Sequence, residues 1–173
     1  MNNSIPTNIV RFIIVFLAQI WIFKHITFSF GGFVFIHFLI YPMAILLLPI
    51  KFSRIFALIL AFILGIFIDM SYDSVGVHTG ALVFTAYIRN IIIAFLEPYE
   101  GYNIDDVPTI KNMGIGWFVS FLSISLLIHT FMYFSLEAFS FVFIFEIFLN
   151  TISSFIVSFI VILISQFIFR TKY

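Results

Sequence analysis

Long apolar stretches follow one another through nearly the whole chain, and one compact polar segment, Gly65 to Gly76, interrupts them. Hydrophobic residues make up 63% of the 173 residues and charged residues only 9%, with a mean hydropathy of +1.22. A water-soluble domain needs a largely polar surface, which this composition cannot provide. The sequence therefore predicts an integral membrane protein that folds with lipid as its solvent.

The chain has the length of a single domain, residues 1–173. A helix needs about 20 residues to cross the hydrocarbon core, so six spans with short connections fill the chain. The apolar runs and the polar, Gly and Pro residues between them predict an all-α membrane domain with six transmembrane helices, at residues 8–23, 33–48, 53–68, 77–96, 117–134 and 141–169. Pro42 falls within the second predicted span, where it is expected to kink the helix.

Positive charges near the ends of the spans predict the orientation of the protein. With a cytoplasmic N-terminus, only Lys24 lies outside, whereas the inside carries Arg11, Lys51, Arg54, Lys111, Arg170 and Lys172. We therefore expect both termini in the cytoplasm. Arg89 lies within the fourth span and is expected to snorkel toward the cytoplasmic headgroups. The long cytoplasmic loop Glu97–Gly116 is either a solvated connector or a docking segment for another protein.

Polar side chains inside or beside the spans predict specific contacts. His129 and Glu146 lie at matching distances from the turn near Glu137, and an unpaired ionisable group in hydrocarbon costs several kcal/mol, so a His129–Glu146 pair is predicted. Asp69 stands at a helix C-terminus, where a carboxylate opposes the helix dipole. We expect it to accept hydrogen bonds from backbone amides of the turn that it opens, near Ser71 or Asp73.

Two interpretations of these polar residues stay open. In the first, an outward-facing cation or proton site is formed by Asp69, Asp73, His78, His129 and Glu146. In the second, which we prefer, they are interhelical hydrogen-bonding groups and a capped turn, because a metal needs a tighter cluster than the sequence guarantees. The chain has no cysteine, no Gly-x-Ser-x-Gly elbow and no phosphate-binding loop. We predict no enzyme activity, no catalytic residues, no cofactor and no metal.

Small residues predict where helices approach closely. Ala57, Ala61 and Gly65 recur every four residues and so lie on one face of the third span. Such a face allows close packing against another helix of the chain or against a partner. Gly76 permits a tight turn, and Gly80 lies in the small-residue start of the next helix.

Three groups of residues are distinctive in their order and spacing. They are Phe62–Asp69 with Val75–Ala81, the loop segment Glu97–Tyr102, and Leu136–Phe141. Together with the length and the number of spans, they resemble the family of rod shape-determining proteins MreD, in the form found in Bacteroidetes-type bacteria. Gly65, Asp69, Gly76 and Gly80 are motif positions with an implied structural role, and the family has no established catalytic residues. The turn Tyr72-Asp73-Ser74 departs from the Gly or Pro of many relatives.

The resemblance implies a multi-pass protein of the bacterial inner (cytoplasmic) membrane. Its implied function is that of a non-enzymatic scaffold of the cell-elongation (rod) complex, which contributes to cell-shape maintenance and to the placement of peptidoglycan synthesis. The implied partners are the bitopic protein MreC, the actin-like MreB, and the glycosyltransferase RodA with its transpeptidase partner. The implied fold is similar to the substrate-binding subunits of energy-coupling-factor transporters, so the alternative function is a small-molecule-binding subunit of a transporter.

Overall fold

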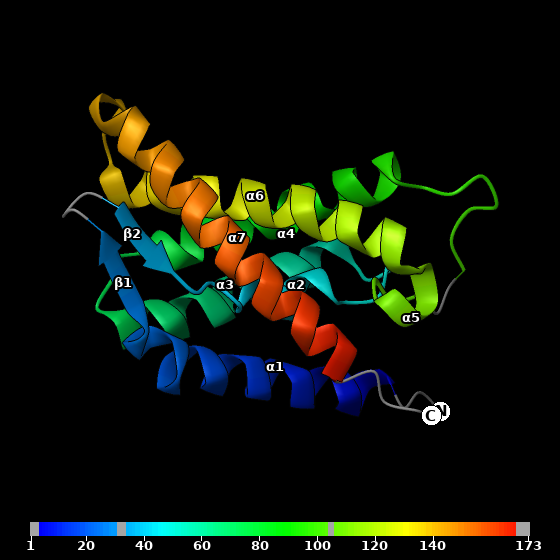
Figure 1. Cartoon of the computed structure of the whole chain (residues 1–173). Coiled ribbons are helices and arrows are strands. Elements are labelled where there is room, and N and C mark those ends of the chain that lie inside the picture. Colours follow the sequence, from blue (N-terminus) through cyan, green and yellow to red (C-terminus); the bar gives the residue numbers. More distant parts are fainter. Residues whose placement is uncertain (1–3, 31–33, 104–105, 169–173) are drawn as a thin grey trace.

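The computed structural model describes residues 4–30, 34–103 and 106–168 (Figure 1). Most of this part of the chain is helical, with one short β-hairpin near the N-terminus. In chain order the elements are α1 (Ser4–Trp21), the 3-10 turn η1 (Phe23–His25), β1 (Thr27–Phe30), β2 (Val34–His37), α2 (Pro42–Leu46), α3 (Arg54–Tyr72), α4 (Val77–Phe95), α5 (Ile110–Met113), α6 (Ile115–Ala138), the 3-10 turn η2 (Phe141–Phe143) and α7 (Ile144–Ile168).

Within the described residues, four helices are long and apolar enough to cross a membrane: α3, α4, α6 and α7. They coincide with the last four predicted spans, so the prediction of a mostly helical, multi-pass membrane protein is confirmed. The helix α1 covers most of the first predicted span, 8–23, and lies along the same bundle (Figure 1). The start of α1, the end of α7 and the loop between α4 and α5 all lie at one end of the bundle.

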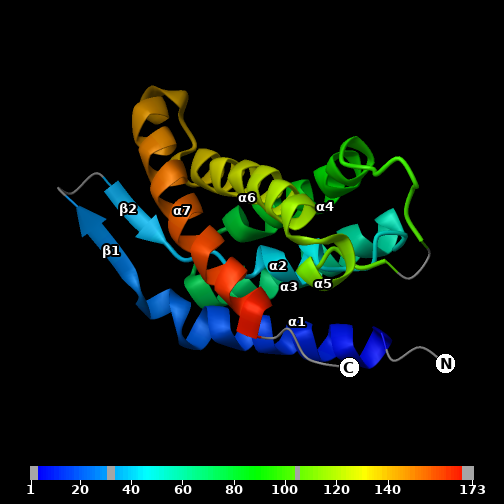
Figure 2. The ribbon, with the colours of Figure 1, turned by 45° about the vertical axis from the view of Figure 1, so that its right-hand side comes forward.

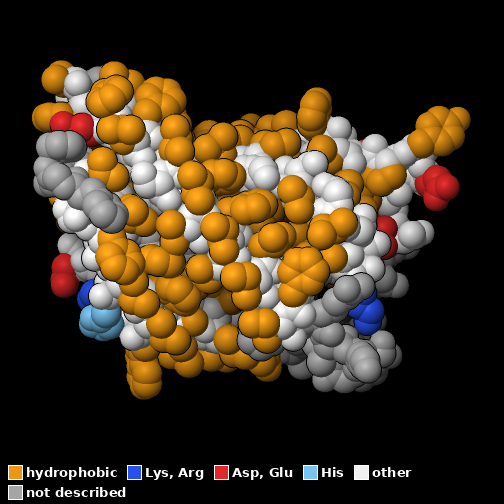
Figure 3. All heavy atoms as spheres, in the orientation of Figure 1, with side chains coloured by type: hydrophobic (Ala, Val, Ile, Leu, Met, Phe, Trp, Pro, Cys, Tyr) orange, Lys and Arg blue, Asp and Glu red, His pale blue; other side chains and the backbone are white. Residues whose placement is uncertain are grey.

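The surface has the distribution of side chains that a membrane requires. Figure 3 shows one face, on which hydrophobic side chains cover the broad central region and charged side chains gather at the two ends. Large apolar residues are exposed on every long helix, among them Ile59, Phe95, Leu127 and Ile160. Burying this surface in lipid removes the penalty that water would impose on it.

The second predicted span is wrong. The described part of this span, residues 34–48, does not form one helix; it contains β2, an extended segment and the five-residue helix α2. Strands β1 and β2 pair as an antiparallel hairpin, with Thr27 opposite His37, so the all-α prediction fails here as well. A continuous apolar run does not distinguish a buried extended segment from a helix. Pro42 does not kink a long helix but begins a short one, at the position where its missing N–H is not needed.

The inserted segment, defined here as residues 34–48, reaches the centre of the bundle. All five residues of α2 are buried. This helix packs against α1, α3, α4 and α6 (Figure 2). The pairs α3–α4, α4–α6 and α6–α7 are the main contacts between the long helices. The long helices thus surround a core that is only partly helical.

Candidate functional site

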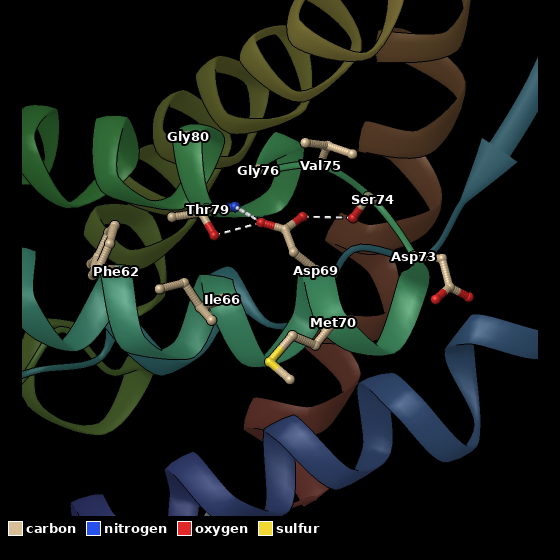
Figure 4. A pocket seen from close by; sticks show the side chains of 10 residues that line it. All are labelled: Phe62, Ile66, Asp69, Met70, Asp73, Ser74, Val75, Gly76, Thr79 and Gly80. Carbon is tan, nitrogen blue, oxygen red and sulfur yellow. Dashed lines mark hydrogen bonds between the residues drawn. The ribbon is translucent and has the colours of Figure 1, made fainter.

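The carboxylate of Asp69 joins the end of α3 to the start of α4 (Figure 4). Its Oδ1 accepts hydrogen bonds from the Ser74 hydroxyl at 2.6 Å and from the His78 amide at 3.0 Å. Its Oδ2 accepts from the Thr79 amide at 2.9 Å and from the Thr79 hydroxyl at 2.5 Å. Asp69 therefore accepts a hydrogen bond from the turn that it opens, as predicted. The predicted amides near Ser71 or Asp73 are wrong, because the amide donors are His78 and Thr79 in the first turn of the next helix.

This arrangement supplies a helix cap that the local sequence lacks. The N-cap of α4 is Gly76, which has no side chain to accept from the first amides of the helix. Asp69 does so from the preceding helix, with the favourable charge for a helix N-terminus. Gly76 has φ +79°, a left-handed conformation that glycine adopts at no steric cost. Asp73, also left-handed at φ 54°, is exposed and takes no part in the cap.

The small-residue face of α3 packs inside the chain. Ala57, Ala61 and Gly65 are all buried. A Cβ atom added at Gly65 would lie 2.5 Å from the Cα atom of Thr79, which is closer than real contacts allow. On α4, a Cβ atom at Gly80 would lie 2.8 Å from a side-chain carbon of Leu136. The face predicted from Ala57, Ala61 and Gly65 therefore serves close approach within this bundle.

An open groove of about 620 Å³ runs along the outer side of the α3–α4 turn (Figure 4). Phe62, Ile66 and Met70 follow one another at four-residue spacing on α3 and are exposed. Val75 on the turn is 99% exposed, and Gly76 and Gly80 contribute no side chain to the α4 wall. The result is a largely apolar groove at the end of the bundle where the β1–β2 hairpin lies. Asp69 and Asp73 lie at the α3–α4 turn.

A chain of buried hydrogen bonds crosses the interior beside this turn. The Tyr41 hydroxyl lies 3.0 Å from His78 Nδ1 and 2.9 Å from His129 Nε2. Thr85 Oγ1 lies 2.8 Å from His129 Nδ1 and donates to the carbonyl of Ala81 at 2.7 Å.

The number of available donors fixes which group donates in each of these hydrogen bonds. Because the Thr85 proton goes to Ala81, Thr85 accepts from His129 Nδ1–H, and His129 Nε2 then accepts from Tyr41. Tyr41 in turn accepts from His78 Nδ1–H. Each imidazole therefore uses one N–H within this chain of bonds.

The predicted His129–Glu146 pair is wrong. Both ring nitrogens of His129 are used by Tyr41 and Thr85, and Glu146 is exposed at the start of α7. The wider cation site is not assembled either, since Asp73 and Glu146 are exposed and Asp69 bonds to the start of α4. In residues 4–30, 34–103 and 106–168 no group of three or more His, Asp or Glu side chains could hold a metal ion. The sequence pattern missed Tyr41, which joins the two histidines from the inserted segment.

Arg89 is buried, at 1% exposure, and does not snorkel. Its Nε donates to the carbonyl of Leu46 at 3.3 Å, and its Nη2 donates to the carbonyls of Leu48 and, at 3.1 Å, Pro49. Leu46 is the last residue of the short helix α2, and Leu48 and Pro49 follow it, so the guanidinium lies at the C-terminal end of this helix, where a positive charge is favourable. The snorkelling prediction failed because the hydrogen-bond acceptors come from a segment that the sequence assigned to a long helix.

The loop between α4 and α5 is only partly solvated. The Tyr102 hydroxyl donates to the carbonyl of Ile93 at 2.8 Å and accepts from the indole N–H of Trp117 at 3.2 Å. Burial raises the pKa of the Tyr102 hydroxyl above its ordinary value of 10.0, although the hydrogen bond from Trp117 opposes that shift. Tyr99 is fully exposed. One aromatic residue of the loop thus anchors it to the bundle, and the other is open to a partner.

No family model, curated protein or solved structure matches this chain.

Proposed function

We propose that this chain is a non-enzymatic scaffold of the bacterial cell-elongation (rod) complex, of the MreD kind, in the cytoplasmic membrane. The observation that carries the proposal is the α3–α4 groove, which is apolar and open. Most polar atoms beside it are bonded within the protein, since Asp69 caps α4 and Tyr41 joins His78 to His129; the buried Nε2 of His78 has no partner within the described residues. A surface of this kind suits the association of a helix better than the chemistry of a substrate.

The proposed occupant of the groove is the single membrane span of MreC. Phe62 to Met70 covers about 12 Å along α3 at 1.5 Å per residue, roughly two helical turns. Gly76 contributes no side chain to the groove and has open space around it, so a second helix can approach closely there. The exposed carboxylate of Asp73 stands at the turn, where it would attract a basic residue flanking the partner span. MreB and the RodA–transpeptidase pair would then associate through other surfaces of the assembly.

A photo-crosslinking residue placed at Ile66 tests this function in native cells. The matched control is Ile160, which is exposed on α7 away from the groove. The expected result is a crosslink to MreC from position 66 that is absent from position 160. RodA and its transpeptidase partner should be recovered with the tagged protein after crosslinking.

Other outcomes would overturn parts of the proposal. Recovery of an ATPase module and a coupling subunit would favour the alternative, a small-molecule-binding subunit of a transporter. Recovery of MreC with equal crosslinking from both positions would keep the scaffold function but reject the groove as the contact.

A further inference from the structure

A second cavity, of about 270 Å³, lies at the opposite end of the molecule from the groove. It is enclosed by the connection from α2 to α3, by the last turns of α4 and by Tyr102. Lys51 and Arg54 come from the connection and the start of α3, and Asn90 and Glu97 come from α4. Ile93 and Ala94 give it an apolar wall. This is the end of the protein that the charge pattern assigns to the cytoplasm.

Positive charge dominates the cavity. Lys51 and Arg54 line it, and the carboxylate of Glu97 is the one acidic side chain in its wall. The buried Arg89 precedes the wall residue Asn90 on α4 but does not itself line the cavity. Arg89 bonds to carbonyls rather than to an acid, and its Nη1 has no hydrogen-bond partner within the described residues. Lys51 and Arg54 therefore outnumber Glu97 among the charged side chains of the cavity wall.

The backbone adds to this positive potential. Helix α3 begins at Arg54, on the cavity wall, and its N-cap Ser53 makes no side-chain hydrogen bond to the first turn. The N-terminus of a 19-residue helix thus contributes its dipole and free amides at the same place as Lys51 and Arg54.

We propose that this cavity binds the phosphate group of an anionic phospholipid from the adjacent leaflet. A phosphate diester carries one negative charge and several acceptor oxygens, which match the guanidinium of Arg54, the ammonium of Lys51 and the amide of Asn90. The apolar wall of Ile93 and Ala94 suits the glycerol and the first carbons of the acyl chains. Basic pockets between helices at the cytoplasmic surface are suited to acidic headgroups. This site does not depend on the scaffold function.

The test is native mass spectrometry of the full chain in a mild detergent, with three probes. These are phosphatidylglycerol, phosphatidylcholine and inorganic phosphate. Phosphatidylglycerol should bind the native protein more tightly than the other two. The double variant Lys51→Ala/Arg54→Ala should bind it about 30-fold more weakly, from roughly fivefold for each cation beside an anionic headgroup. Lys111→Ala, at the same end but outside the cavity, should bind like the native protein.

A second variant changes affinity in the opposite direction. Glu97→Gln removes the one acidic side chain of the wall and should tighten the binding of phosphatidylglycerol. Equal binding by the native protein and the double variant would overturn the proposal. If inorganic phosphate bound as tightly as phosphatidylglycerol, the cavity would be a site for a free anion and the proposal would be overturned. If phosphatidylcholine bound as tightly as phosphatidylglycerol, the net negative charge of the lipid would not matter, and the proposal would also be overturned.

Discussion

The α3–α4 hairpin and the inserted segment solve the same problem in opposite ways. In lipid every backbone N–H and C=O must find a partner inside the protein. Helices α3 and α4 satisfy most of theirs internally, and at the turn between them Asp69 accepts from the first amides of α4. The inserted segment is extended before α2. Its strand β2 pairs with β1 along one edge, and side chains on α1 and α7 supply further partners.

The partners on α7 match the extended backbone in spacing. Asn150, Ser154 and Ser158 accept from the amides of Phe35 at 2.9 Å, His37 at 2.9 Å and Leu39 at 2.8 Å, respectively. Four residues of helix rise about 6.0 Å, and two residues of strand rise about 6.6 Å, so each step on α7 meets alternate amides of the segment. The Ser154 and Ser158 hydroxyls also donate to the carbonyls of Phe35 and His37.

Gln19 on α1 completes the arrangement. It donates to the carbonyl of Phe38 at 2.9 Å and accepts from the amides of Ile40 at 2.9 Å and Tyr41 at 3.3 Å. The helix α7 thus takes the place of a neighbouring strand, and one glutamine covers the backbone where that contact ends. The inserted segment therefore depends on individual side chains, whereas the α3–α4 hairpin depends on close packing.

The largest effect is expected from Gln19→Leu. The variant leaves a carbonyl and two amides of the inserted segment unsatisfied, at roughly 1–3 kcal/mol for each buried group. We expect the free energy of unfolding in detergent to fall by about 3 kcal/mol or more. Gln166→Leu is the control, a glutamine of α7 whose side chain makes no hydrogen bond in the described structure, and should change stability by less than about 0.5 kcal/mol. Equal losses in the two variants would contradict the role of Gln19.

The next largest effect is expected from a change in the packing of the α3–α4 hairpin. Gly65→Ala places a methyl group against the backbone of Thr79, so α3 and α4 must move apart at a cost of roughly 1–3 kcal/mol. Gly116→Ala, in a helix with open space around the added atom, should be neutral or slightly stabilising. Chemical denaturation of both variants in detergent measures the difference. An unchanged stability for Gly65→Ala would show that the close approach is not needed.

A smaller effect distinguishes two neighbouring serines of α7. Ser154→Ala removes the acceptor of the His37 amide and should cost about 1–2 kcal/mol. Ser153 donates to the carbonyl of Leu149 in its own helix, so Ser153→Ala should cost much less. Hydrogen exchange of the His37 amide is the direct measurement, and it should become faster in Ser154→Ala alone. Acceleration in both variants would show a general loosening of α7.

The smallest effect lies outside the membrane, in the loop after α4. Tyr102→Phe removes the hydrogen bond to Ile93 and should cost about 0.5–1.5 kcal/mol near neutral pH. Because the folded state favours protonated Tyr102, its stabilisation is complete below the ordinary pKa of 10.0 and is lost as the pH rises toward the raised folded pKa. The stability gap between native protein and variant should therefore narrow in alkaline solution. Thermal unfolding of both proteins from neutral to alkaline pH measures this difference. A difference in stability that stays constant with pH would contradict the raised pKa of Tyr102.

Hydrophobicity made four spans predictable, because long apolar runs in α3, α4, α6 and α7 can be buried only in lipid. The close approach of helices at Ala57, Ala61 and Gly65 was also predictable, because helical periodicity places these three residues on one face of α3. The importance of Asp69 followed from its place at the end of α3, but its partners did not, because they lie across a turn whose path depends on Asp73 and Gly76.

Composition and helical periodicity are enough to predict that this protein folds in lipid and which long helices satisfy their own backbone. The form of residues 34–48 depends instead on tertiary contacts, since an extended segment in lipid needs the partners that β1, Gln19 and the polar side chains Asn150, Ser154 and Ser158 of α7 supply. The partner of His129 also depends on this segment, because His129 bonds to Tyr41 of the segment rather than to Glu146. Local pattern fixes a helix because its hydrogen bonds are local, whereas the inserted segment is fixed by residues more than a hundred positions away.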